Sequence, residues 1–305
     1  MDTRQRGRAD LLDPSELDAL GSLELIARAV VRGFISGLHR SSSRGFSVEF
    51  AEHRAYRPGD DLRFVDWKMY GRSDRFYLKQ YEEETNLAAY VCLDVSRSMD
   101  WRSRTSGLLT KLDYARRVAA SLTLLLVRQG DMAGLYCFAE SVLSRTPARS
   151  TPEHWVQLVQ QLAAQQPGRM SGAEGALEEA ASVMRRRGLV ILISDLLVAE
   201  DDTRRALFKL RHQGHEVLVF HILDPGELDL PGIGDAIFVD PETDDEVIAR
   251  SAELRSEYRD AVRSAIEEWR RICGAQAIDY HTLPTDQPLA LCLGQYLHAR
   301  ARLRR

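Results

Sequence analysis

Two short apolar runs constrain the fold of this chain more than any other feature. LAAYVCL (87–93) and GLVILIS (188–194) are almost uninterrupted apolar stretches, which is typical of strands buried on both faces of a sheet. A long segment with helical apolar periodicity, residues 110–129, follows the first run. Strands that alternate with helices imply right-handed crossovers between parallel strands. The sequence therefore predicts an α/β fold with a doubly wound, mostly parallel sheet that carries helices on both faces.

The rest of the chain supplies the other elements of this fold and two segments ahead of it. Further strands are expected at 132–138, 142–143, 216–223 and 277–280, a hairpin at 237–247, and further helices at 152–165, 173–187, 202–213, 251–273 and 288–302. An apolar stripe predicts a helix over 14–40, and short alternating spans with turn residues predict hairpins over 45–84. We therefore predict an N-terminal helical arm (1–42), a small β-rich module (43–85) and a large α/β domain (86–305).

The charge balance argues against nucleic acid or an anionic membrane as an obligatory partner. The chain has 41 Lys and Arg against 45 Asp and Glu, a net charge of −4. Residues 40–79 look basic at first sight, but they contain nine Lys and Arg against six Asp and Glu. A mixed surface of this kind favours ion pairing within the module over nucleic-acid binding.

The cysteines and the N-terminus point to a reducing compartment. Cys92, Cys137, Cys273 and Cys292 form no CxxC pair, so we expect buried free thiols. No apolar stretch follows the first basic residues, as a signal peptide would require, and no run reaches the roughly 18 apolar residues of a membrane span. We expect a cytoplasmic protein that does not insert into a membrane.

Polar side chains follow both apolar runs. Asp94, Ser96 and Ser98 alternate after the first run, and Asp195 follows the second. Ligands of doubly wound sheets bind outside the carboxyl ends of the strands, where these residues should lie. Because alternate side chains of an extended segment point the same way, the oxygens of Asp94, Ser96 and Ser98 should face one side. Hard divalent cations prefer oxygen ligands. The pattern predicts a divalent-cation site; the alternative is that Asp94 and Ser96 only cap a loop or a helix.

Two segments resemble known families. DVSRSM (94–99) followed by ISD (193–195) resembles the metal-ion-dependent adhesion site of von Willebrand factor A domains, and residues 39–84 resemble the bacterial "domain of unknown function 58" family. The resemblance implies a von Willebrand factor A-like domain with the metal ligands Asp94, Ser96, Ser98, Asp195 and, in place of the usual threonine, Ser171. The implied cation is Mg²⁺, with Mn²⁺ or Ca²⁺ as alternatives.

The same resemblance implies partners and a function. Relatives accompany MoxR-type AAA+ ATPases, so the expected function is a non-enzymatic, metal-dependent protein-binding module that acts as an assembly factor. An acidic residue of a client protein would complete the coordination of the metal. The alternative is a metal-assisted hydrolase that uses the same carboxylates. Against it, the eight histidines form no HExxH pattern, and the chain contains no GxSxG and no GxxxxGK[ST] motif.

Overall fold

The computed structural model describes residues 22–41, 53–55, 70–71, 77–79, 87–103, 109–168, 173–184, 187–197, 200–229, 235–239 and 246–303. The chain divides into two compact units. One unit contains Met1–Ile35 and Asn86–Arg305, and the other contains Ser36–Thr85.

The larger unit is built on a six-stranded sheet with the strand order β10-β7-β6-β3-β4-β5. Neighbouring strands pair in parallel, except that β5 pairs antiparallel with β4. The strands are β3 (Ala88–Asp94), β4 (Met132–Phe138), β5 (Val142–Arg149), β6 (Leu189–Ser194), β7 (Glu216–Leu223) and β10 (Asp279–Pro284). The first strand of this sheet in the chain, β3, lies in its middle. The chain continues outward through β4 and β5, then crosses to the other side of β3 at β6 and continues through β7 to β10. This is the doubly wound α/β architecture that the sequence predicts.

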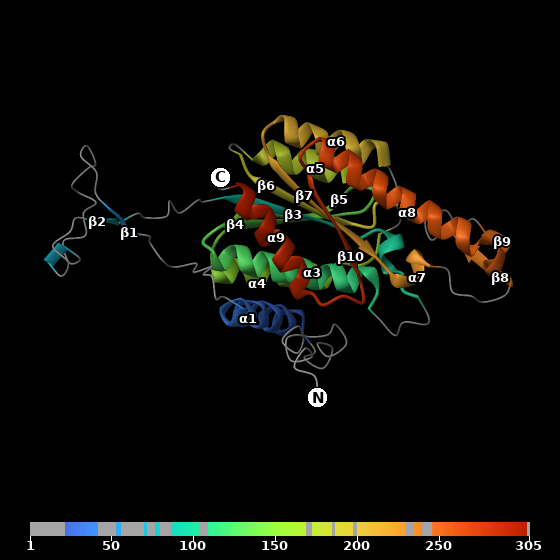
Figure 1. Cartoon of the computed structure of the whole chain (residues 1–305), viewed down its shortest axis with the longest axis horizontal. Helices are drawn as coiled ribbons and strands as arrows, with labels where there is room; N and C mark the ends of the chain where they lie inside the picture. The colour runs from blue at the N-terminus through green and yellow to red at the C-terminus, as the bar shows by residue number, and fades with distance from the viewer. Residues whose placement is uncertain are drawn as a thin grey trace. The chain divides into compact units, whose positions relative to one another are not determined.

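Helices cover both faces of this sheet (Figure 1). One face carries α1 (Leu23–Ser41), α3 (Lys111–Arg128), α4 (Pro152–Ala164) and α9 (Ala290–Leu303); the other carries α5 (Ala173–Val183), α6 (Glu200–His212) and α8 (Ser251–Ala275). Alternate residues of β3 feed the two cores, since Val91 and Leu93 pack with the first set of helices and Tyr90 and Cys92 with the second. Burial on both faces explains the near-continuous apolar runs.

Helix α3 illustrates how local sequence signals place an element under the sheet. Its N-cap is Thr110, whose hydroxyl oxygen accepts a hydrogen bond from the Asp113 backbone N–H at 3.1 Å. Most of the helix is buried against the sheet. It ends where Gly130 takes a φ of 80°, a left-handed conformation that glycine adopts without strain.

Helix α1 belongs to the same core. Ile26, Ala27, Val30 and Val31 are buried in the cluster that includes α3 and α4. The guanidinium of Arg28 lies 4.8 Å from the ring centroid of Trp155 in α4, which is cation–π distance. Residues 14–21 of the predicted helix lie outside the described residues.

Two strands differ from the sequence prediction. β5 extends over Val142–Arg149 rather than over 142–143. It is an edge strand whose residues alternate between half-buried and exposed, so its sequence lacks the continuous apolar run that marks a strand buried on both faces. Such a strand tolerates Arg145 and Pro147, which break the apolar pattern. β10 begins at Asp279 rather than at residue 277, because Ala277 has a φ of 52° and forms part of a turn. The other elements of the larger unit lie close to their predicted positions.

Two small antiparallel pairs complete the described structure. In the smaller unit, β1 (His53–Ala55) pairs with β2 (Tyr77–Lys79), while most of the predicted 43–85 module lies outside the described residues. In the larger unit, β8 (Asp235–Val239) and β9 (Glu246–Arg250) form the predicted hairpin. The four cysteines are buried and free, as predicted. Among the described helices, none combines the length and apolarity that a membrane span requires.

Candidate metal-binding site at the sheet edge

The predicted site lies where the direction of winding reverses. Asp94 ends β3 and Ser194 ends β6, and these strands are parallel neighbours with Leu93 opposite Ile193. Asp195, directly after β6, therefore lies at the same edge of the sheet as Asp94. In sheets of this order, the crevice at the reversal point is the usual ligand site. Of the five predicted ligands, Ser171 lies outside the described residues.

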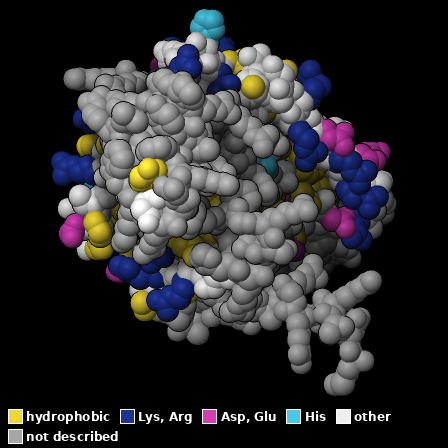
Figure 2. Space-filling view, turned by 60° about the vertical axis from the view of Figure 1, so that its left-hand side comes forward, with side chains coloured by type: hydrophobic (Ala, Val, Ile, Leu, Met, Phe, Trp, Pro, Cys, Tyr) yellow, Lys and Arg dark blue, Asp and Glu magenta, His cyan; other side chains and the backbone are white. Residues whose placement is uncertain are grey.

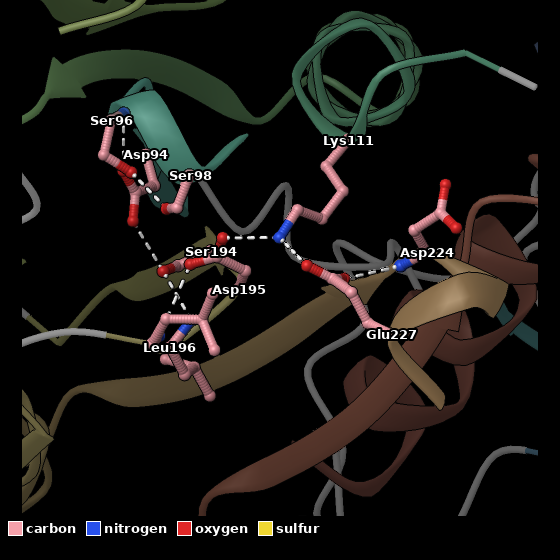
Figure 3. A network of polar contacts seen from close by, with 10 residues as sticks. Asp94, Ser96, Ser98, Lys111, Ser194, Asp195, Leu196, Asp224 and Glu227 are labelled. Carbon is pink, nitrogen blue, oxygen red and sulfur yellow. Dashed lines mark hydrogen bonds and ion pairs between the residues drawn. The ribbon is translucent and has the colours of Figure 1, made fainter. Parts of the chain in front are cut away.

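The loop after β3 turns its oxygens toward one another (Figure 3). The Ser96 backbone N–H donates to Asp94 Oδ1 at 2.9 Å, and the Ser96 and Ser98 hydroxyl oxygens are 3.1 Å apart. A short 3-10 helix, η3 (Arg97–Asp100), holds this arrangement, with Arg97 exposed between the two buried serines. Three oxygen-bearing side chains thus converge from five consecutive residues.

Ser194 joins the two strand ends. Its hydroxyl donates to Asp94 Oδ2 at 2.7 Å and accepts from the Leu196 backbone N–H at 3.0 Å. Leu196 has a φ of 56°, which is strained for a leucine. Strained backbone of this kind persists where the surrounding structure holds it, and it is found often at functional sites.

Asp94 and Asp195 influence each other electrostatically. Burial raises the pKa of Asp94 to about 6, and the negative charge of Asp195 adds to the increase, against the opposing effect of the hydrogen bonds from Ser194 and Ser96. The ionised form of Asp94 is therefore disfavoured. A cation beside Asp94 would stabilise that form.

Lys111 was not anticipated from the sequence. Its ammonium lies 2.8 Å from Asp195 Oδ2 and 2.5 Å from Glu227 Oε1, and its side chain is only 1% exposed. Burial alone would lower the pKa of Lys111, but Asp195 and Glu227 together raise it above its ordinary value, so the ammonium is charged. Lys111 is also the first residue of α3, where the helix dipole disfavours a positive charge. That position is the one signal in the sequence that could have revealed it.

Glu227 is held in place by its own turn. It lies in α7 (Pro225–Leu228), where its Oε2 accepts from the Asp224 backbone N–H at 2.9 Å, while Asp224 Oδ1 accepts from the Gly226 N–H at 2.7 Å. Asp224 Oδ2 also accepts from the Ser103 N–H at 3.1 Å, which ties α7 to the segment after η3. This reciprocal capping box fixes Glu227 and, through it, Lys111.

A histidine also lies beside the site. His221 is opposite Ser194 in the β6–β7 register, and its Nδ1 is 2.6 Å from the Tyr280 hydroxyl. Burial lowers the pKa of His221 to about 4, although the charge of Asp195 acts in the other direction. Its imidazole is therefore neutral at pH 7.

The chemistry of these side chains fits a hard divalent cation. Within the described part of the chain, no three His, Cys, Asp or Glu side chains form a metal-binding group. The donors available are instead two carboxylates and the hydroxyls of Ser96 and Ser98, all oxygen and all nearly fully buried. Lys111 already supplies one positive charge to Asp195. Any bound cation would share Asp195 with that ammonium.

These features define a doubly wound α/β domain with a buried carboxylate–hydroxyl site at its point of reversal. The chain belongs to the family described as "Protein of unknown function DUF58", which matches residues 52–268. It is 29% identical over 286 residues to an uncharacterized protein of Mycobacterium tuberculosis, covering 90% of this chain and 87% of the relative. An uncharacterized protein of Mycobacterium avium is 32% identical over 168 residues, which cover 52% of this chain and 96% of that protein.

Solved structures with a similar chain course share little sequence with this protein. An aerotolerance-related membrane protein of Bacteroides fragilis matches with a TM-score of 0.49 and 16% identity, covering 70% of this chain and 99% of that chain. A von Willebrand factor type A protein of Catenulispora acidiphila matches with a TM-score of 0.43 and 14% identity, covering 70% of this chain and 42% of the other.

Proposed function

We propose that this chain is a metal-dependent protein-interaction module that acts in the cytoplasm and is not itself an enzyme. One observation supports the proposal: Asp94, Ser96 and Ser98 at the end of β3 lie at the same edge of the sheet as Asp195 at the end of β6, close enough for the charge of Asp195 to raise the pKa of Asp94. This arrangement gives a small donor set in which every ligand atom is oxygen: the carboxylates of Asp94 and Asp195 and the hydroxyls of Ser96 and Ser98. Such a set suits Mg²⁺, and also Mn²⁺ or Ca²⁺.

In this proposal, Asp94, Ser96 and Ser98 hold the cation, with Asp195 and Ser171 as further ligands. The bound cation would offer an open coordination position to a carboxylate of a partner protein. Asp195 is already neutralised in part by Lys111, which leaves Asp94 as the carboxylate whose charge the cation has to balance. We therefore expect Asp94 to dominate the metal affinity.

Burial of the site has a consequence for binding. Asp94, Ser96, Ser98 and Asp195 are each at most 1% exposed. A partner's carboxylate can reach a cation at this site only when neighbouring segments move. Association that requires a conformational change is slower than association of two preformed surfaces. We expect slow, metal-dependent binding.

For the partner, we propose a MoxR-type AAA+ ATPase together with a client protein that supplies the acidic residue. The support is the family resemblance and the absence of a nucleotide-binding GxxxxGK[ST] motif from this chain. On the face in Figure 2, described basic side chains stand beside acidic ones, which suits a protein partner better than nucleic acid.

The test is a binding assay between this protein and the AAA+ ATPase of the same organism, with and without client, in Mg²⁺ and in EDTA. We expect binding in Mg²⁺ that is lost in EDTA and in Asp94→Ala. Asp100→Asn is the matched control, because Asp100 is an exposed aspartate in the same loop. Binding that persists in both EDTA and Asp94→Ala contradicts the proposal.

The alternative of a metal-assisted hydrolase gains one observation, the neutral imidazole of His221 beside Asp195. A general base works best when its pKa is near the working pH, and a pKa of about 4 makes His221 a weak base at pH 7. We therefore favour the interaction module. Phosphoester or nucleotide turnover by the purified protein in Mg²⁺, abolished in His221→Gln, would reverse this preference.

A further inference from the structure

An open groove of about 410 Å³ lies beside α8. Its apolar lining comes from Leu223 at the end of β7, Leu228 in α7, Pro284 at the end of β10, and Val262 and Ile266 in α8. A volume of this size falls within the range of about 300–1,000 Å³ that is common for ligand sites. The groove can therefore accept a few side chains of a bound molecule.

One face of α8 forms the groove wall. Val262 and Ile266 are four residues apart on this face and half-buried, and the same face continues into the core as Trp269 and Cys273. Residues with this spacing lie above one another on a helix. The stripe that packs into the core at one end of α8 is thus left partly uncovered at the groove.

The charged lining of the groove is mostly basic. Arg259, Arg263 and Arg270 line it with only one acid, Glu267. Among the described residues, Arg259 and Arg270 form no ion pair within 4.0 Å, although the charge of Arg259 is close enough to Asp229 to lower the pKa of that carboxyl. Arg263 is 3.9 Å from Asp260, and both of these side chains are well exposed, so the pair is weak.

We propose that this groove binds an acidic segment of a partner protein whose apolar side chains fill the floor. Unpaired guanidinium groups recognise carboxylates, and arginine is enriched in protein interfaces. A free phosphate or a nucleic-acid backbone fits less well, since neither brings apolar side chains to cover the floor formed by Val262 and Ile266. The inference rests on the proposed function in one respect, that the chain binds a protein.

The groove also adjoins the buried polar site through two pairs of consecutive residues. Leu228 lines the groove, and the preceding residue, Glu227, holds Lys111. Leu223 lines the groove, and the next residue, Asp224, caps α7. A partner segment in the groove would therefore contact the turn that positions the counter-charge of Asp195.

The experiment measures fluorescence anisotropy of a labelled peptide in which Leu and Phe alternate with Asp and Glu, added to the full chain. We expect saturable binding that Arg259→Glu and Arg270→Glu each weaken by about tenfold or more. Ile266→Ala should weaken it as well, since it removes part of the floor. Arg271→Glu is the matched control: it makes the same charge change at the neighbouring exposed position, which does not line the groove.

Several results overturn the inference: no binding to the wild type, equal binding of a peptide with Lys in place of Asp and Glu, or equal losses in Arg270→Glu and Arg271→Glu. Tighter binding of a single-stranded oligonucleotide through the same arginines also overturns it. The assay is repeated in EDTA with Asp94→Asn. Peptide binding that persists in EDTA and in Asp94→Asn supports the groove even if the metal-dependent function proves wrong. Failure of the groove proposal can therefore be told apart from failure of the proposed function.

Discussion

The buried site and the α8 groove lie on the same domain, but they differ in whether their charged side chains have partners within the protein. At the buried site, the Lys111 ammonium is held between two carboxylates, and Asp94 accepts hydrogen bonds from the loop and from Ser194. In the groove, Arg259 and Arg270 are exposed and have no carboxylate within ion-pair distance in the described part of the chain. A buried charge without a counter-charge destabilises the folded state, whereas exposed charges without an ion pair can bind a partner. Substitutions in the first region should therefore change stability, and those in the second should change binding.

The largest effect is expected for Lys111→Met. This substitution leaves the buried Asp195 carboxylate without its counter-charge, which typically costs about 3–5 kcal/mol of unfolding free energy. Urea denaturation followed by circular dichroism measures the change. Lys209→Met is the control, because Lys209 and its partner Glu178 are both exposed, and such pairs contribute about 1 kcal/mol or less. Similar losses in the two variants would contradict the structural role of Lys111.

The second effect concerns pH. Asp94 has a pKa of about 6 in the folded protein against an ordinary value of 3.8, so the folded form keeps its proton to higher pH than the unfolded form. Without a divalent cation, stability should therefore fall as the pH rises from about 4 to 6, by about 3 kcal/mol for this group. Asp94→Asn should lack this fall and be more stable than the wild type at pH 7 in EDTA. Denaturant titrations of the wild type and of Asp94→Asn in EDTA at pH 4, 6 and 7 test this. An Asp94→Asn variant that is less stable than the wild type at pH 7 would disprove it.

A smaller effect is expected on adding Mg²⁺. At ten times its dissociation constant, a cation that binds only the folded state adds about 1.4 kcal/mol to stability. The melting temperature at pH 7 should rise modestly in the wild type and in Asp100→Asn, and should not rise in Asp94→Asn. Thermal denaturation followed by fluorescence measures it. Unfolding of the protein by EDTA alone would mean that the cation is structural.

The smallest effect on stability is expected in the groove. Arg270→Ala should change the unfolding free energy by no more than about 0.5 kcal/mol, because the side chain is exposed and has no ion-pair partner among the described residues. The same variant should lose affinity for the acidic peptide. A clearly destabilised Arg270→Ala would remove the contrast between the two regions.

The central strands were predictable because burial on both faces leaves a strong pattern in the sequence. β3 and β6 follow from their apolar runs, and α3 follows from its apolar periodicity. β5 was mostly missed, since an edge strand with one exposed face carries arginines and a proline. Propensity and periodicity describe local environment, so they are least informative at the edge of a sheet.

The convergence of Asp94 and Asp195 was also predictable, because parallel neighbouring strands end at the same edge. The contacts of Lys111 were not. They join residues separated by 84 and 116 positions along the chain, and no short-range pattern encodes such a contact. The position of His221 was not predictable for a similar reason, since only the register of β6 and β7 brings it opposite Ser194. Whether Asp94, Ser96, Ser98, Ser171 and Asp195 bind a cation stays a prediction.

The packing of α1 has a topological consequence. Because Ile26, Ala27, Val30 and Val31 are buried in the larger unit, Ser36–Thr85 is an insertion whose two connections both lead back to the same body. A single proteolytic cut within that insertion would leave both fragments associated, since α1 stays bound through its apolar face. Native gel filtration after such a cut should recover one particle, although a denaturing gel would show two chains.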